Sequence, residues 1–144
     1  MYKKLLFVVI ILMMGLSACS GGTSGSVSGS QQSCRGGSGE VVCDGSINKL
    51  SGTYNLEADA GYFNEGDAIL VEAYFITTIG SMKVSVEAPD GSLTEAEVIP
   101  GEIGVLLGLG TVESFIDENT IPITLHAVDG DVEGITFEIY LSQP

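Results

Sequence analysis

The strict alternation of apolar and polar side chains in two segments is the feature that most constrains the fold. In residues 81–88 one side is formed by Met82, Val84, Val86 and Ala88. In residues 135–142 one side is formed by Ile135, Phe137, Ile139 and Leu141, and the other by Thr136, Glu138, Tyr140 and Ser142. Successive side chains of a β-strand point to opposite faces. The alternation therefore predicts two strands, each with one buried face and one face in water.

Five further segments are predicted to form strands: residues 53–58, 67–78, 93–99, 112–116 and 121–128. Residues 67–78 are apolar or β-branched on both faces, which is typical of a strand in the middle of a sheet. Pro122 has no N–H to donate, so we expect it at a strand start or at a sheet edge. Turn sequences such as Pro89-Asp90-Gly91 and Asp129-Gly130 separate the segments.

The spacing of these segments predicts an all-β fold. A strand recurs about every ten residues, and no long stretch has helical periodicity. Residues 40–144 are therefore expected to form an acidic antiparallel β-sandwich of about seven to nine strands, immunoglobulin-like in size. The Cys…Trp…Cys signature of antibody domains is missing because the chain has no tryptophan, so the strand topology stays open.

The amino-terminal segment has the order of an export signal. Lys3 and Lys4 precede residues 5–16 (LLFVVIILMMGL), which are almost wholly apolar but too short to cross about 30 Å of hydrocarbon as a helix. Leu16-Ser17-Ala18-Cys19 resembles the lipobox of bacterial lipoproteins, in which an aliphatic residue and two small residues precede an invariant cysteine. An uncleaved membrane anchor or a buried strand is the alternative interpretation.

The resemblance implies cleavage between Ala18 and Cys19 and lipidation of Cys19. Residues 1–18 would then be a signal peptide, and the Cys19 sulfur would carry a diacylglyceryl group with palmitate-like acyl chains. Two acyl chains hold a protein stably at a membrane, whereas one does so only marginally. Ser20 stands where an aspartate would resemble the inner-membrane retention signal. The cell outer membrane is therefore favoured if the organism has two membranes.

Residues 19–39 follow the signal peptide and are expected to form a flexible tether. They are rich in glycine and serine and have almost nothing to bury. The fifteen or so residues before Cys34 would have a root-mean-square reach of about 20 Å. Such a tether would lift the domain off the lipid headgroups without taking part in recognition.

The three cysteines divide into one lipid site and one pair. If Cys19 is acylated, Cys34 and Cys43 remain, and an exported compartment permits disulfides. The glycine-rich segment between them can bend back, so we predict a Cys34–Cys43 disulfide that joins the tether to the first strand. A metal or redox pair is the alternative, although the spacing is not CxxC and the chain has one histidine.

The formal net charge is −14, from nineteen acidic and five basic residues. This charge repels DNA, RNA and anionic lipid headgroups, so no nucleic-acid partner is expected. It is compatible with cation binding, with a high-salt habitat or simply with solubility.

Three segments of the domain loosely resemble the pre-peptidase C-terminal type of bacterial β-sandwich. They are residues 52–58 (GTYNLEA), 65–71 (EGDAILV) and 84–91 (VSVEAPDG). Those modules place a tyrosine-containing strand, a Gly-Asp turn, an apolar strand and a Pro-Asp-Gly-like turn in this order. The Asp-x-Asp-Leu-Tyr motif often seen there is missing from this sequence, so the resemblance implies a fold and no function.

Two groups of polar residues could carry chemistry. His126 lies in an alternating segment, on the face opposite Leu125 and Ala127. It is either a surface residue of a strand or the base of a small hydrolase, although no GxSxG motif accompanies it. Asp129, Asp131 and Glu133 place three carboxylates at alternate positions of a turn. They are either a solvated hairpin tip or a Ca²⁺ site, because Ca²⁺ takes oxygen ligands that short acidic loops can supply.

Residues 103–109 (IGVLLGL) form an apolar segment flanked by glycine. We expect a buried strand or a short helical crossover, and an exposed patch for a partner or a membrane is the alternative. Taken together, the features favour a non-enzymatic envelope lipoprotein that presents a β-sandwich for protein or matrix contacts. The alternatives are a Ca²⁺- or small-ligand-binding module that uses the acidic loops and, less favoured, a hydrolase built on His126. No cofactor other than Ca²⁺ is expected.

Overall fold

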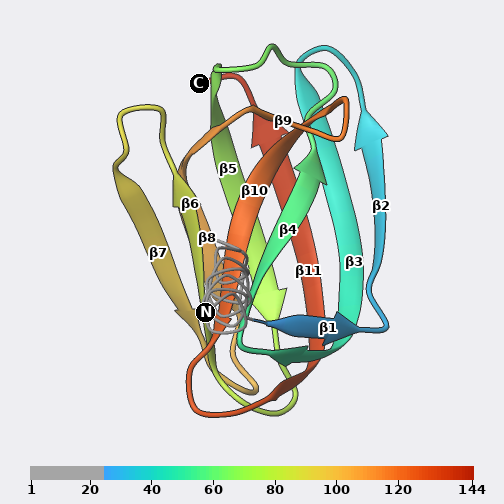
Figure 1. Ribbon diagram of the computed structural model, residues 1–144, viewed down its shortest axis with the longest axis vertical. Coiled ribbons are helices and arrows are strands. Elements are labelled where there is room, and N and C mark those ends of the chain that lie inside the picture. Colours follow the sequence, from blue (N-terminus) through green and yellow to red (C-terminus); the bar gives the residue numbers. More distant parts are fainter. Residues whose placement is uncertain (1–24) are drawn as a thin grey trace, which may run out of the picture.

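Eleven antiparallel strands in two packed sheets make up the described part of the chain, residues 25–144, in a computed structural model (Figure 1). The strands are β1 (Ser26–Ser28), β2 (Gln31–Gly36), β3 (Glu40–Ser51), β4 (Thr53–Asp59), β5 (Ala68–Ile76), β6 (Met82–Glu87), β7 (Leu93–Val98), β8 (Gly104–Thr111), β9 (Glu113–Phe115), β10 (Glu118–Ala127) and β11 (Val132–Ser142). The predicted all-β antiparallel sandwich is confirmed, with more strands than the seven to nine expected. No helix among residues 25–144 is long and apolar enough to cross a bilayer.

The first sheet, here called sheet A, has the strand order β1-β3-β11-β5-β8, and β2 also pairs with β3. The second sheet, sheet B, has the order β4-β10-β6-β7, and β9 also pairs with β10. The two segments with strict alternation, residues 81–88 and 135–142, correspond to β6 and β11, one in each sheet. β5 lies between β11 and β8, as predicted for residues 67–78.

The core lies between the sheets and is built from the inward-facing residues of the alternating strands. It includes Val71, Phe75, Val84, Leu125, Ile139 and Leu141, which are all almost completely buried. The rings of Phe75 and Phe137 lie with their centroids 6.0 Å apart. Burial of such side chains is the main favourable contribution to the free energy of folding.

Pro122 was expected at a strand start or at an edge, and it lies inside β10. β4 pairs with β10 along one side, from Thr120 to His126. On the other side, β9 pairs with residues 118–120 and β6 with residues 124–127. Pro122 therefore falls in the interval where that side of β10 has no paired strand among the described residues, and this interval is a local edge.

The expected flexible coil over residues 19–39 is wrong for residues 26–36. β1 pairs with β3 through Ser26 to Ser28, and β2 pairs with β3 through Gln31 to Gly36. The side chains of these strands are mostly exposed and polar, so their composition resembles that of a linker. Backbone hydrogen bonds to β3 hold them in the sheet, and such bonds do not depend on side-chain hydrophobicity.

The predicted disulfide between Cys34 and Cys43 is confirmed. The two residues are direct partners in the β2–β3 register, and Cys43 is completely buried. The bridge therefore fastens the edge strand β2 to a strand that belongs to the core.

Replacing both cysteines with serine is expected to lower the free energy of unfolding by about 2–3 kcal/mol, because the bridge restricts the unfolded chain. Urea unfolding of the oxidised protein and of the double variant measures this difference. The unsubstituted protein under reductant serves as the control and should lose a similar amount. An unchanged free energy of unfolding in both cases would contradict the prediction.

Candidate functional site

Two tyrosines and two glutamates form a square on the outer face of sheet A. Glu72 and Tyr74 lie two residues apart on β5, and Glu138 and Tyr140 lie two residues apart on β11. The register places Glu72 opposite Tyr140 and Tyr74 opposite Glu138. The four residues, here called the Tyr–Glu quartet, therefore alternate like a checkerboard and point away from the core.

Hydrogen bonds within each strand hold the quartet in place. The hydroxyl of Tyr74 donates to the carboxylate of Glu72, and the hydroxyl of Tyr140 donates to Oε1 of Glu138 at 2.5 Å. The two rings meet edge to face, with centroids 6.2 Å apart and an interplanar angle of 90°. This arrangement is favourable for aromatic pairs. Because the side chains already hold one another, little conformational entropy remains to be lost on binding.

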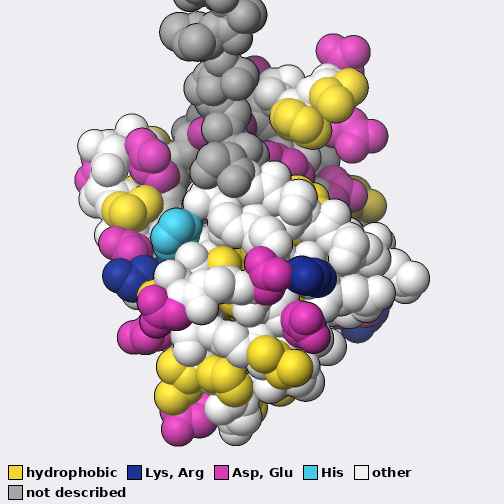
Figure 2. All heavy atoms as spheres, turned by 60° about the horizontal axis from the view of Figure 1, so that its bottom comes forward, with side chains coloured by type: hydrophobic (Ala, Val, Ile, Leu, Met, Phe, Trp, Pro, Cys, Tyr) yellow, Lys and Arg dark blue, Asp and Glu magenta, His cyan; other side chains and the backbone are white. Residues whose placement is uncertain are grey.

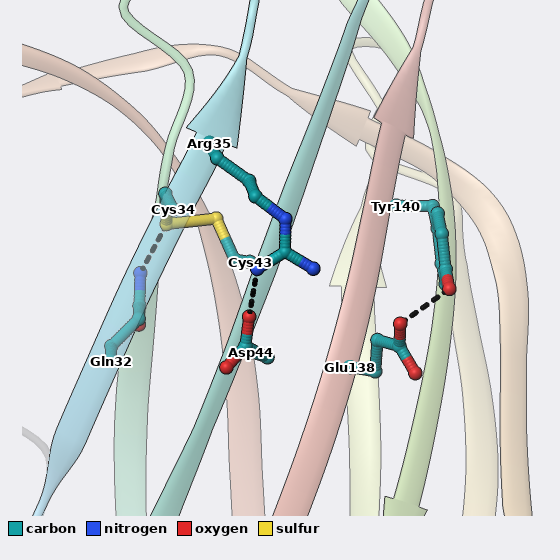
Figure 3. A network of polar contacts seen from close by, with 7 residues as sticks. All are labelled: Gln32, Cys34, Arg35, Cys43, Asp44, Glu138 and Tyr140. Atoms are coloured by element: carbon teal, nitrogen blue, oxygen red, sulfur yellow. Dashed lines mark hydrogen bonds and ion pairs between the residues drawn. A yellow bond between two sulfur atoms is a disulfide. The ribbon is translucent and has the colours of Figure 1, made fainter.

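A second polar contact borders the quartet on the β3 side (Figure 3). Asp44 of β3 is the register partner of Glu138. The guanidinium of Arg35, on β2, lies 2.8 Å from the carboxylate of Asp44. Since this pair is largely exposed, its contribution to stability is small. The pair is relevant because of its position. The guanidinium of Arg35 binds Asp44, so the glutamates of the quartet keep their hydrogen bonds to the tyrosines.

The quartet raises the pKa of both tyrosines above the ordinary value of 10.0. The first cause is the hydrogen bond that each phenol donates to its glutamate, because only the neutral phenol can make it. Burial and the nearby carboxylates act in the same direction. The stability that these bonds contribute is fully present below pH 10 and is lost as the pH rises through the raised pKa of the folded state.

Glu72→Gln is expected to lower the pKa of Tyr74 towards its ordinary value, because a neutral amide no longer favours the protonated phenol. Glu138→Gln should act in the same way on Tyr140 and serves as the matched variant. The measurement is an alkaline titration followed by the tyrosine ring signals in NMR spectra. If neither substitution moves either pKa, the hydrogen bonds of the quartet do not exist in solution.

A shallow, open hollow of about 650 Å³ lies over the quartet. Asp44 borders it on one side and Ile76 and Ile103 on another, so acidic, aromatic and aliphatic groups all face the same space. Binding sites in proteins commonly combine apolar walls with a few oriented polar groups. The hollow can therefore receive a group that is partly apolar and partly cationic.

The apolar segment 103–109 lies beside the hollow and is largely exposed, as in the alternative interpretation of its sequence. In β8, Val105 is 49% exposed, Leu107 60% and Leu109 38%, whereas Leu106 is buried. The expected strand is present, but only its inner face, with Leu106 and the glycines, is buried, so the expectation of a fully buried strand or a helical crossover is wrong. A Cβ on Gly108 would come within 2.6 Å of Thr94 on β7, so the sheets approach too closely there for a side chain. Val105, Leu107 and Leu109 are here called the β8 stripe.

His126 lies on the other sheet and faces outward, as its position opposite Leu125 and Ala127 predicted. Its Nδ1 lies 2.7 Å from Oγ1 of Thr53, the residue opposite it on β4. Neither a serine nor a carboxylate is among the hydrogen-bond partners of this ring within residues 25–144. His126 is exposed and pairs with Lys83 of β6 in the register, and Figure 2 shows acidic side chains scattered over this face of the molecule. The structure therefore gives it the contacts of a surface strand residue.

The three carboxylates predicted as a Ca²⁺ site do not come together. Asp131 accepts a hydrogen bond from Ser51 at 2.6 Å and lies 2.9 Å from Nζ of Lys49. The hydrogen bond from Ser51 lowers the pKa of Asp131, and that from Lys49 acts in the same direction. Asp129 and Glu133 do not complete a ligand set with it, and within residues 25–144 no group of three or more ligating side chains could hold a metal ion. The turn sequence indicated three acids but not that Asp131 pairs with Lys49 and Ser51.

The quartet was not predicted as a site from the sequence. The alternation in residues 135–142 predicts Glu138 and Tyr140 on the solvent face, whereas the apolar composition of residues 67–78 hides the outward position of Glu72 and Tyr74. The triplet Glu-x-Tyr occurs in both strands, as Glu72-Ala73-Tyr74 and Glu138-Ile139-Tyr140. This repeat in two of the predicted strands was the available signal. Cys19 and its lipobox lie outside the described residues.

The comparisons with known proteins leave the family open. No protein-family model matches the sequence, and no curated protein matches it significantly. One solved structure that resembles the fold is peruvianin-I, a cysteine peptidase from Thevetia peruviana latex, with 13% identity and a TM-score of 0.35. The match covers 73% of this chain and 51% of the peptidase, so it spans about half of that protein. A likeness this weak carries no inference about activity.

Proposed function

We propose that this chain is a non-enzymatic lipoprotein of the cell envelope whose β-sandwich binds another envelope protein through the outer face of sheet A. The lipobox-like residues 16–19 support the address, since acylation of Cys19 would hold the domain at a membrane. The absence of an aspartate after Cys19 favours the outer membrane. The net charge of −14 disfavours nucleic acids and anionic lipid surfaces as the bound partner.

The observation that carries the proposal is the pairing of the Tyr–Glu quartet with the β8 stripe on one face. Tyrosines are frequent among the residues that contribute most to protein–protein binding. Exposed aliphatic side chains that lie together and have a polar border mark contact surfaces. Here both features lie on neighbouring strands, because β5 pairs with β11 on one side and with β8 on the other. The tyrosines are already fixed by their glutamates, which suits binding more than a reaction that needs a free acid or base.

Site-specific photocrosslinking in living cells tests this proposal. A photoreactive amino acid at Ile76, which is 41% exposed beside the hollow, is expected to give a discrete adduct with an envelope protein. The matched position is Phe115, which is 51% exposed on sheet B and is expected to give none. The adduct from position 76 should weaken when Tyr140 is replaced with alanine. Equal adducts from both positions, or an adduct indifferent to Tyr140, would refute the proposal.

A further inference from the structure

β8 is a sheet edge that has neither charged residues nor proline and packs its inner face against β7. It is the last strand of sheet A, and among the described residues it pairs only with β5. Gly104 to Thr111 contains neither a charged residue nor a proline. Natural edge strands are commonly blunted by such residues, because an open edge offers its backbone groups to another strand. An eight-residue edge without them is suited to strand addition.

Side chains on the outer face form two rows that run from β8 across β5 to β11. The first row contains Leu107, Glu72 and Tyr140, and the second contains Val105, Tyr74 and Glu138. Neighbouring strands lie about 4.8 Å apart, so Glu72 and Tyr74 stand one strand behind the β8 stripe. Each row thus begins with an aliphatic residue at the edge and continues with an acid or an aromatic ring.

We propose that β8 accepts an extended segment of a partner protein as an additional strand, and that this segment carries lysine or arginine opposite Leu107 and Val105. The inference rests on the proposed function and names the chemistry of the partner. A lysine or arginine stem would lie over the aliphatic side chain at the edge, because these residues bury their methylenes and extend their charge. The charge opposite Leu107 would reach Glu72, and the charge opposite Val105 would reach the ring of Tyr74.

Charge favours this occupant over a second copy of the chain. A second copy would bring another acidic domain to the same edge, since the net charge is −14. Its own β8 would supply only aliphatic side chains and glycines to the two rows, and the carboxylates would gain no cationic partner. A basic segment satisfies both the aliphatic edge and the acids behind it.

Peptide binding to the purified full chain in detergent tests the inference. The probe is a dye-labelled octapeptide of alternating valine and lysine, measured by fluorescence anisotropy. A valine–glutamate peptide is expected to bind at least about tenfold more weakly, because like charges then meet across each row. Methylation of the peptide's backbone nitrogens should weaken binding to a similar degree, since strand addition needs these donors. Raising the salt concentration should also weaken the binding of the valine–lysine peptide, because salt screens the attraction between charges.

Three variants localise the binding. Leu107→Lys should reduce affinity for the valine–lysine peptide about tenfold through repulsion, and Glu72→Gln should reduce it several-fold. Phe115→Lys adds the same charge at an exposed residue of sheet B and should change it by less than about twofold. An equal loss from Phe115→Lys, or equal binding of both peptides, overturns the inference. So does a concentration-dependent dimer in sedimentation that Leu107→Lys abolishes, because a second copy would then occupy the edge. If photocrosslinks from position 76 persist while no peptide binds, the strand-addition inference alone fails and the proposed function stands.

Discussion

Replacing Cys19 with alanine is expected to abolish the attachment of fatty acid to this protein. The thiol at position 19 is the group that the lipobox resemblance assigns to acylation, and alanine has no nucleophile to replace it. Each buried methylene contributes about 0.8 kcal/mol to membrane binding, so the loss of two or three chains removes the entire lipid contribution. The measurement is incorporation of an alkyne-labelled palmitate in growing cells, followed by mass spectrometry of the mature amino terminus.

The matched control for Cys19→Ala is the Cys34→Ser/Cys43→Ser double variant. It also removes thiols, but these form the disulfide in the folded domain, so it should keep the palmitate label at the level of the unsubstituted protein. Label retained in the alanine variant would contradict the lipid anchor. An unmodified cysteine at position 19 in native protein would do the same.

The largest loss of stability is expected from Phe75→Ala. Phe75 is completely buried on the inner face of β5, and its ring lies against Phe137. Truncation of a buried phenylalanine costs about 3–5 kcal/mol, because transfer energy is lost and a cavity remains. Domains of this size are stable by only about 5–15 kcal/mol, so the variant should lose a large part of its free energy of unfolding. Urea unfolding followed by circular dichroism measures the change.

Phe115→Ala is the control for this core substitution, because Phe115 is about half exposed and should cost less than about 1 kcal/mol. A double-mutant cycle with Phe137→Ala isolates the contact between the two rings, with an expected coupling of about 0.5–1.5 kcal/mol. If Phe75→Ala and Phe115→Ala cost the same, β5 does not turn Phe75 into the core. That result would mean that the inner and outer faces of sheet A are the reverse of those described, and that the quartet does not lie on the outer face.

Alternation of side chains was sufficient to find the strands whose faces differ in polarity. β6 and β11 follow directly from their period of two, and β5 follows from its apolar composition on both faces. The disulfide could also be predicted, because its two cysteines flank a short glycine-rich segment. In each case the information lies within a few residues of the chain, where spacing and side-chain chemistry decide the outcome.

The rest depended on pairing between distant residues. β1 and β2 are held by backbone bonds to β3, which leave no trace in side-chain composition. In β8 the aliphatic residues face outward because Gly104 and Gly108 allow close approach of β7, and the sequence does not reveal that approach. The quartet exists only because β5 and β11 are neighbours in one register. A shift of that register by one residue would turn the side chains of one strand to the opposite face and separate the two tyrosines.

The ordering of β1 has a consequence for the height of the domain above the bilayer. If Cys19 carries the lipid, only six peptide units separate it from Gly25, where the described chain begins. Six peptide units span at most about 20 Å when fully extended. The sandwich would then stay close to the lipid headgroups and would diffuse mainly in the plane of the membrane. Its partner would have to reside in the same membrane or reach down to it.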